Sequence, residues 1–307
     1  MSQDSGGQSQ APTVQLGLLR SSEWLLVIYF AYTAILAQVW SFRSSGREAL
    51  HLADLAVPVA LWLVAYADSL SESEFTSVVR DWMPAPTVLV AYWRMGSFEL
   101  PHHSQTLERA WIAWDKVLLH DWGGLEAIER FGLAPAVLGL SYLLVYAIPP
   151  FCIFVLYIHH RRDRVDRFFF TFLLGTLLTY SLLPYFPSDP PRLAFPGDDA
   201  PAVSTTFRQI TLWLLDRYDI RTSVFPSGHV TAAFSAAFAM FLVLPEKRWV
   251  GWALSALACS IAITTVYGRY HYAVDGLAGF AVSLAALGIS ASLYPAQRFA
   301  AATRISV

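Results

Sequence analysis

A histidine and an aspartate stand one helical turn apart near the end of the chain, within VYGRYHYAVDGLAG. Residues four apart share one face of a helix, so Asp275 can hold one ring nitrogen of His271 and orient the other. An imidazole held in this way can act as a nucleophile, and the carboxylate stabilises the charged ring. We therefore predict His271 as a nucleophile, although such a pair on its own also has a purely structural interpretation.

A second motif, FPSGHV, precedes a long apolar run. Pro226, Ser227 and Gly228 predict a turn that opens a helix, whose free N–H groups and dipole attract anions. Glycine also allows an anion to approach the backbone closely. His229, in the first turn, can give a proton to an oxygen that leaves the anion. By itself the motif is equally typical of a capped helix start.

A third motif, FPSDPPRLAFPG, places Arg192 directly after two prolines that stiffen the loop. A fixed guanidinium suits bidentate phosphate binding, whereas a lone arginine here would be read as an interfacial residue. Arg269 supplies a second cation beside the nucleophile. The three motifs together provide charge stabilisation, a nucleophile and an acid, which are the parts of phosphoryl transfer. The predicted phosphate-binding residues are Arg192, Arg269, Ser227 and Gly228.

We expect no cofactor and no metal ion. Divalent metals are held by carboxylates or by several imidazoles, and Asp275 is the only carboxylate near a histidine of these motifs. Two further groups of polar residues could suggest a metal site. The first lacks regular ligand spacing, and the second is better explained as solvated residues. They are His102, His103, His120 and Asp121 in one group, and Asp189, Asp198 and Asp199 in the other.

The composition indicates a polytopic membrane protein. Of the 307 residues 55% are hydrophobic and 14% are charged, and the mean hydropathy is +0.45. This is too apolar for an ordinary soluble domain, and a net charge of −2 gives no sign of a nucleic-acid partner. Cys152 and Cys259 lie in apolar runs and are expected to be small buried residues rather than a disulfide or metal pair.

Apolar segments of spanning length predict an all-α membrane helical bundle with about seven transmembrane helices. They lie near residues 24–42, 50–69, 133–158, 168–186, 229–245, 249–267 and 272–294. Whether residues 78–96 span the membrane stays open, because the apolar stretch is short and holds Pro84 and Pro86. We favour a half-inserted element there.

One membrane domain with tails is expected. Residues 1–22 are polar and predicted to be disordered, residues 23–132 hold the first spans and an outer interfacial segment, residues 133–294 form the catalytic core, and residues 295–307 form a cytoplasmic tail. The first tail lacks the features of a signal peptide. No convincing internal repeat is present.

Residues 105–122 have an amphipathic pattern, with Leu107, Trp111, Trp114 and Leu118 on one helical face. The opposite face carries Glu108, Arg109, Asp115 and Lys116. The pattern fits a helix in the membrane interface, and it fits equally well a helix packed on the outer part of the protein itself.

The distribution of basic residues predicts the orientation. The loops at residues 159–167 and 246–248 and the C-terminal tail are positive and should face the cytoplasm. The segment from Asp68 to Arg130 is acidic on balance and should lie outside. All three motifs then fall on the extracytoplasmic side, and the expected location is a bacterial inner membrane.

The ordered motifs PSGH and, two spans later, HYAVDGLAG resemble the type 2 phosphatidic acid phosphatase (PAP2) superfamily over residues 133–294. The variant that begins with PPR is similar to the branch containing inositol phosphorylceramide synthase. The resemblance implies a phosphohistidine on His271, acid–base action by His229 and an orienting Asp275. It also implies phosphate binding by residues 192, 227 and 228.

Two positions depart from the superfamily pattern. Tyr185 stands where a lysine is common, seven residues before Arg192, and Thr265 stands where an arginine is common, six residues before His271. Arg269 is a candidate to replace the second of these cations from the other side of Tyr270.

These observations predict an integral membrane lipid phosphatase that hydrolyses a phosphate ester or pyrophosphate on the extracytoplasmic face. The alternative is a phosphotransferase that passes phosphate or a phospho-headgroup to a lipid or polyol alcohol. A proton-relay transporter would spread ionisable groups through the membrane depth, whereas here they cluster at one surface. A catalytically inactive scaffold would not need every one of these groups. The expected partners are a lipid phosphate and membrane lipids, and the oligomeric state stays open.

Overall fold

The computed structural model describes residues 17–39, 51–71, 73–99, 104–197 and 200–294. Every regular element within these ranges is helical, which confirms the all-α prediction. The predicted tails at 1–16 and 295–307 lie outside the described residues. So do His102, His103, Asp198 and Asp199, which were considered as metal ligands.

Six helical segments of the described chain are long and apolar enough to cross a membrane. They contain α1 (Ser21–Val39), α3 (Ala53–Leu70), α8 (Ala134–Leu144) with α9 (Ile148–Ile158), α10 (Val165–Leu182), α14 (Arg248–Tyr267) and α15 (Ala273–Leu293). The seventh predicted span is the shorter α13 (Gly228–Val243), of 16 residues. All seven predicted spans are thus helices in the structure.

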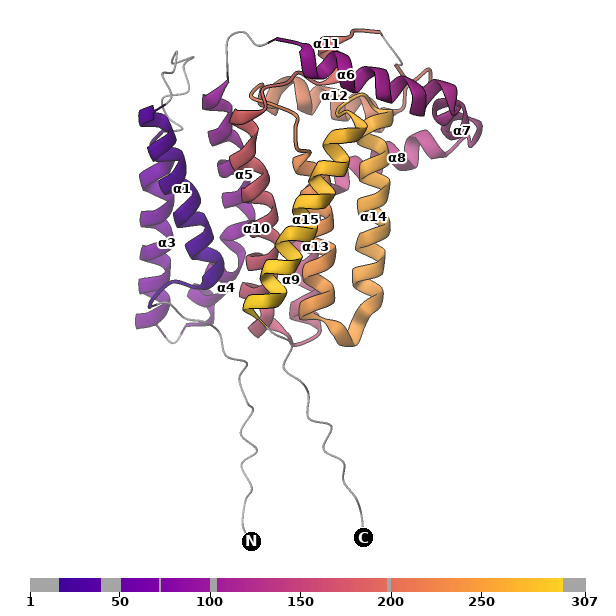
Figure 1. Ribbon diagram of the computed structural model, residues 1–307. Helices are drawn as coiled ribbons and strands as arrows, with labels where there is room; N and C mark the ends of the chain where they lie inside the picture. The colour runs from indigo at the N-terminus through magenta and orange to yellow at the C-terminus, as the bar shows by residue number, and fades with distance from the viewer. Residues whose placement is uncertain (1–16, 40–50, 72, 100–103, 198–199, 295–307) are drawn as a thin grey trace, which may run out of the picture.

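The upright helices are capped at one end by helices that lie across them (Figure 1). The transverse layer contains α6 (Thr106–Lys116), α7 (Gly124–Arg130) and α12 (Thr206–Tyr218), and the short α11 (Pro191–Ala194) belongs to the same end. This is the end at which the three sequence motifs meet, and we call it the site end. The opposite end carries the basic loop at residues 159–167, and we call it the basic end.

Helix α13 lies at the centre of the bundle, against α10, α14 and α15. Small residues let these backbones approach, as is common for helices that pack in membranes. A Cβ on Gly175 of α10 would lie 2.2 Å from the hydroxyl oxygen of Ser235 and 3.4 Å from Ala286 of α15. The run of alanines in α13 therefore sets the close spacing of three helices.

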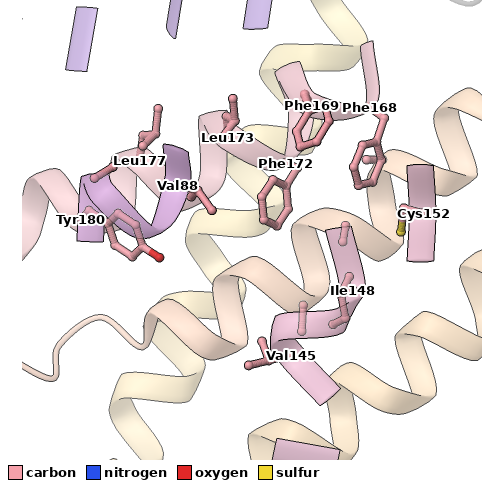
Figure 2. Close-up of a cluster of buried hydrophobic side chains, with 14 of the residues drawn as sticks. Val88, Val145, Ile148, Cys152, Phe168, Phe169, Phe172, Leu173, Leu177 and Tyr180 are labelled. Atoms are coloured by element: carbon pink, nitrogen blue, oxygen red, sulfur yellow. The ribbon is translucent and has the colours of Figure 1, made fainter. Parts of the chain in front are cut away.

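An aromatic layer fills the space between α10 and its other neighbours (Figure 2). Phe168, Phe169 and Phe172 of α10 pack on one another beside Ile148 of α9. Cys152 is buried in this layer, but Cys259 is exposed, so the prediction that both cysteines are buried is wrong for the second. Neither thiol is bonded to the other.

Residues 78–96, whose topology the sequence left open, lie mostly in two helices that cross the bundle. Helix α4 (Glu74–Trp82) lies at the basic end, where Asp81 accepts hydrogen bonds from Tyr157 and Arg162. Helix α5 (Pro84–Met95) then runs to the site end, where the carbonyl of Met95 accepts a hydrogen bond from Thr222. The pair of helices thus connects both ends of the bundle, and the half-inserted element stays a prediction because α4 and α5 are not among the helices long and apolar enough to span a membrane.

The same observation corrects the expected topology of the acidic segment. Asp68 pairs with Arg80 of α4, and both lie at the basic end together with the first residues of α1. Only the part of the segment that follows α5 belongs to the site end. The net charge of residues 68–130 gave the wrong location for the first part of the segment. The segment contains two loops that lie at opposite ends of the crossing formed by α4 and α5.

Helix α6 packs on the protein itself, which decides between the two interpretations of residues 105–122. Its buried face consists of Glu108, Trp111, Ile112 and Asp115. Of the predicted apolar face only Trp111 packs inwards, whereas Leu107, Trp114 and Leu118 are exposed. Glu108 and Asp115 therefore point inwards, and Asp115 pairs there with the buried Arg269, as described below.

Candidate functional site

Three elements from distant parts of the sequence converge at the site end. His271 lies in the turn between α14 and α15, His229 lies in the first turn of α13, and Arg192 lies in α11. The imidazole centroids of His229 and His271 are 6.0 Å apart. One phosphate can therefore contact both rings.

His271 has the partner that the sequence predicted. Its Nδ1 lies 3.2 Å from Oδ2 of Asp275, and the same oxygen accepts the backbone N–H of Tyr272 at 2.9 Å. The ionised carboxylate is a hydrogen-bond acceptor, so it favours the tautomer in which Nδ1 carries the proton. The other ring nitrogen, Nε2, then holds the lone pair that a nucleophile needs.

The electrostatic surroundings keep His271 neutral. Burial lowers its pKa from 6.5 to about 4, a shift that Asp219 opposes and Arg192 reinforces. An uncharged imidazole is the nucleophilic form. With this low pKa the ring is not protonated near neutral pH, so its lone pair stays available.

The turn that carries His271 has an unusual backbone. Arg269 adopts a left-handed conformation with φ of 63°, which L-residues other than glycine, asparagine and aspartate rarely adopt. The N–H groups of Tyr270 and His271 both donate to the carbonyl of Thr265. This tight turn reverses the chain between two helices and points the imidazole across the site end.

Asp115 of α6 fastens the turn on both sides of His271. One carboxylate oxygen pairs with Nη1 of Arg269 at 3.0 Å, and the other accepts the N–H of Ala273 at 3.0 Å. Both side chains of the ion pair are almost fully buried, at 2% and 1% exposure. The transverse helix α6 therefore positions His271 from outside the bundle.

His229 is surrounded by tyrosines. Its ring stacks on Tyr142 at a centroid distance of 4.5 Å and meets Tyr146 edge-on at 6.1 Å. Tyr142 in turn packs against Tyr270 at 4.8 Å. The aromatic rings fix the orientation of the imidazole, and the sequence motifs gave no sign of them.

The predicted anion site at the start of α13 is only partly open. Ser227 is the N-cap, its hydroxyl accepts the N–H of Val230, and the residue is fully buried. Gly279 of α15 lies so close that a Cβ there would be 2.7 Å from the carbonyl oxygen of Ser227, so α13 and α15 pack tightly at this point. Gly228 borders the cavity described below, whereas Ser227 borders neither of the two cavities.

Arg192 is paired and oriented from several sides. Its Nη2 lies 2.8 Å from Oδ2 of Asp219, and its guanidinium carbon lies 6.0 Å from the centroid of the Tyr270 ring. Its backbone N–H donates to the carbonyl of Arg269. The phosphate-binding candidate is thus tied directly to the turn that carries His271.

Arg269 does not meet the histidines. Its side chain faces Asp115 and borders only the polar cavity. Its role as a phosphate ligand stays a prediction. A further cation at this end is Arg208 of α12, which donates to the carbonyl of Gly268 and lies 5.7 Å from the centroid of the Tyr270 ring. No motif identified Arg208, because it stands in a stretch with no recognisable spacing.

The positions that depart from the superfamily pattern have structural roles. Tyr185 is 51% exposed and its hydroxyl meets that of Tyr32 at 3.2 Å. Thr265 is fully buried and supplies the carbonyl that closes the turn before His271. Neither side chain takes the place of a phosphate-binding cation.

Two cavities meet at the site. The first, of about 330 Å³, is mainly apolar and runs from His229, His271 and Arg192 down to Trp82 and Ala85 between α5 and α9. The second, of about 470 Å³, is more polar and lies under α11 and α12. Both volumes lie within the range of ligand sites. The residues common to the two linings are Arg192, Leu215, Asp219 and Val224.

Within the described ranges, no group of three or more histidine, cysteine, aspartate or glutamate side chains is arranged to hold a metal ion. The cations near the histidines are arginines.

A model of the PAP2 superfamily matches residues 109–289, which is more than half of the chain. A PA-phosphatase related-family protein of Dictyostelium discoideum is 40% identical over 60 residues, which are 20% of this chain and 10% of that protein. This chain therefore matches only a small part of that relative's length. No solved structure matches. The superfamily match begins within α6 and leaves α1 to α5 outside it.

Proposed function

The chain belongs to the PAP2 superfamily, and we propose that it is a membrane lipid phosphatase that acts through a phosphohistidine on His271. One observation carries the proposal: a cavity has two histidines and an arginine at one end, and most of its remaining walls are aliphatic and aromatic side chains. A phosphate group joined to a long apolar chain has the same two-part character. A water-soluble phosphate ester would not need the apolar part.

The proposed reaction has two displacements. In the first, Nε2 of His271 attacks phosphorus, the bond from phosphorus to the leaving oxygen breaks, and His229 protonates that oxygen. In the second, an oxygen of water attacks phosphorus, the phosphorus–nitrogen bond breaks, and its electron pair returns to the ring. His229 takes the proton of the attacking oxygen.

The remaining groups stabilise charge. Arg192 and the N–H groups at the start of α13 face the phosphate oxygens, where negative charge is concentrated in the transition state. Asp275 stabilises the ring of His271 while it carries phosphate and a positive charge. A lipid phosphate ester and a lipid pyrophosphate both satisfy this scheme.

The polar cavity favours a second candidate, a phosphotransferase similar to the inositol phosphorylceramide synthase branch. Its volume of about 470 Å³ is large enough for an alcohol acceptor, and it adjoins Arg192. An alcohol oxygen would then replace water in the second displacement. The name of the Dictyostelium relative supports the phosphatase instead.

Product analysis tests both candidates. The purified protein is incubated with a lipid phosphate, with and without a polyol or lipid alcohol. A phosphatase releases inorganic phosphate at the same rate in both cases, whereas a transferase forms a new ester and releases less free phosphate. No turnover of any lipid phosphate or pyrophosphate under either condition contradicts the proposal.

We further propose that the site end faces away from the cytoplasm, in a bacterial inner membrane. The support is the basic end, where Arg161, Arg162 and Arg164 are concentrated in one short loop. The test uses single cysteines at Leu193, which is 50% exposed at the site end, and at Asp163, in the basic loop. In a background without Cys152 and Cys259, an impermeant thiol reagent should label L193C but not D163C in intact cells. The reverse pattern contradicts the orientation.

A further inference from the structure

The guanidinium that should bind phosphate is already paired with a carboxylate. Asp219 follows α12 and lies 2.8 Å from Nη2 of Arg192. The two side chains are only 16% and 20% exposed, so the pair is largely shielded from solvent. A carboxylate and a phosphate present similar oxygens to an arginine. Asp219 therefore holds the position on Arg192 that a substrate phosphate needs.

The carboxylate of Asp219 is fixed from the other side as well. Its Oδ1 accepts a hydrogen bond from the hydroxyl of Tyr92 at 2.5 Å and from the backbone N–H of Ile220 at 3.1 Å. Both oxygens thus have donors, which holds the side chain in one orientation. Tyr92 belongs to α5, which lies outside the part of the chain that matches the superfamily. The carboxylate and the arginine lie within the matched range, and the tyrosine that holds the carboxylate lies before it.

The ion pair marks the boundary between the two cavities. Arg192 and Asp219 line both of them, with His229 and His271 on the apolar side and Arg208 and other charged residues on the polar side. A phosphate that reaches the histidines from the apolar cavity, and one that arrives from the polar cavity, must both approach Asp219. Its negative charge repels each of them.

We propose that Asp219 is a specificity-determining residue that competes with free phosphate for Arg192. The inference rests on the proposed function and adds to it. A lipid phosphate gains apolar contacts along the cavity between α5 and α9, and these contacts offset the displacement of Asp219. Inorganic phosphate has no such contacts and carries a similar negative charge. The carboxylate therefore selects against the free anion and promotes its release when it is a product.

The test is equilibrium binding of inorganic phosphate to the purified protein in detergent, measured by titration calorimetry. Replacing the carboxylate by the isosteric amide in D219N should lower the Kd for phosphate by at least about tenfold, because a buried like charge is removed from the anion site. D219E keeps the charge and should stay within about threefold of wild type. Product inhibition by phosphate should follow the same order.

Two further variants act as controls. D216N removes a nearby exposed aspartate of the polar cavity and should leave the phosphate Kd within about twofold of wild type, because exposed charges are screened. Y92F removes a donor from the carboxylate, keeps the pair and should lower the Kd by a smaller factor than D219N. Y92F also tests the inference if D219N folds poorly.

A phosphate Kd that is unchanged or higher in D219N, or in Y92F where D219N does not fold, overturns the inference. An equal fall in D216N and D219N overturns it too, because the effect would then be general charge. Because the readout is binding, a failure of the proposed function appears separately, as the absence of lipid phosphate turnover in the wild-type protein.

Discussion

The two ends of the bundle both bury charged side chains, but they use them differently. At the basic end, Arg80 pairs with Glu23 and Asp68, while Asp81 pairs with Arg20 and Arg162. These pairs connect α1, α3, α4 and the loop after α9. The carboxylates and guanidiniums are matched to one another, and neither of the two cavities is lined by them.

At the site end, Arg192–Asp219 and Arg269–Asp115 border a cavity through at least one partner, whereas Arg94 and Asp54 form an enclosed pair that lines neither cavity. Arg192 and Asp219 lie between the apolar and the polar cavity, and His271 faces the apolar one. A charge that borders a cavity can exchange its partner for a ligand, whereas a charge enclosed by helices cannot. The comparison teaches that burial of charge does not identify a site, and that access for a ligand does.

The largest expected effect on activity is that of His271→Ala. Removing the nucleophile should lower kcat with a lipid phosphate by at least about a thousandfold, which is typical when an essential catalytic side chain is lost. The thermal unfolding temperature in detergent should change little, because the histidine contributes no enclosed ion pair. Activity above a tenth of wild type would remove His271 from the role of nucleophile.

The matching change at the basic end is Arg80→Ala. It leaves the buried carboxylate of Glu23 and the partly buried carboxylate of Asp68 without their common partner, so it should cost about 3–5 kcal/mol of stability. The unfolding temperature should then fall by roughly 10 °C. The kcat of the folded fraction should stay close to that of wild type. A loss of kcat without a loss of stability would mean that the two ends do not differ as described.

A smaller effect is expected for His229→Ala, and it should depend on the leaving group. An alkyl phosphate needs a proton on its leaving oxygen, so its turnover should fall about a hundredfold or more. An activated aryl phosphate leaves without that proton and should be affected much less. Equal losses on both substrates would assign His229 to phosphate binding rather than to proton transfer.

The wall of the apolar cavity should control chain length. Leu89 of α5 lines the cavity at 37% exposure, whereas Leu144 of α8 has 39% exposure and does not line it. L89W should raise KM for long-chain phosphates by about tenfold, equal to the lost burial of one or two methylene groups. Short-chain phosphates should be affected less, and L144W should affect neither. An identical response of the two variants would place the lipid chain outside the cavity.

A further prediction concerns protonation of His271, which affects stability rather than turnover. Because its pKa is lowered to about 4, the ring should stay neutral over the range in which an ordinary histidine titrates. The unfolded state binds the proton near pH 6.5, so this group should make stability rise with pH between about 4 and 6.5. Selective ¹³C labelling of histidines should show a resonance that titrates near pH 4 and is absent in H271A. A titration near 6.5 would contradict the buried, neutral imidazole.

The sequence was sufficient for the elements that have a strong local signal. The spans follow from apolar runs longer than a bilayer needs, and His271 with Asp275 follows from helical spacing. These signals are local in the chain, so no tertiary information is required.

The rest of the site depends on contacts between distant segments. Arg192 and Tyr270 are surrounded by residues from other segments, namely Asp219, Tyr92 and Arg208. These contacts form only because α5 and α12 fold onto the site end. The residue spacing within those segments does not predict the contacts. The crossing by α4 and α5 was hidden by two prolines and a short apolar length. Asp115 could have been noticed, since an acidic residue on the helix face of Trp111 and Ile112 predicts a buried partner.

The most direct test of the central claim is to trap the covalent intermediate. Wild-type protein and H271A are mixed with a labelled lipid phosphate, quenched in alkali and digested, because a phosphorus–nitrogen bond survives alkali and breaks in acid. We predict a phosphate on the peptide that contains His271 in the wild-type protein, and none in H271A. A labelled phosphate on another residue, or steady turnover by H271A, would contradict the phosphohistidine mechanism.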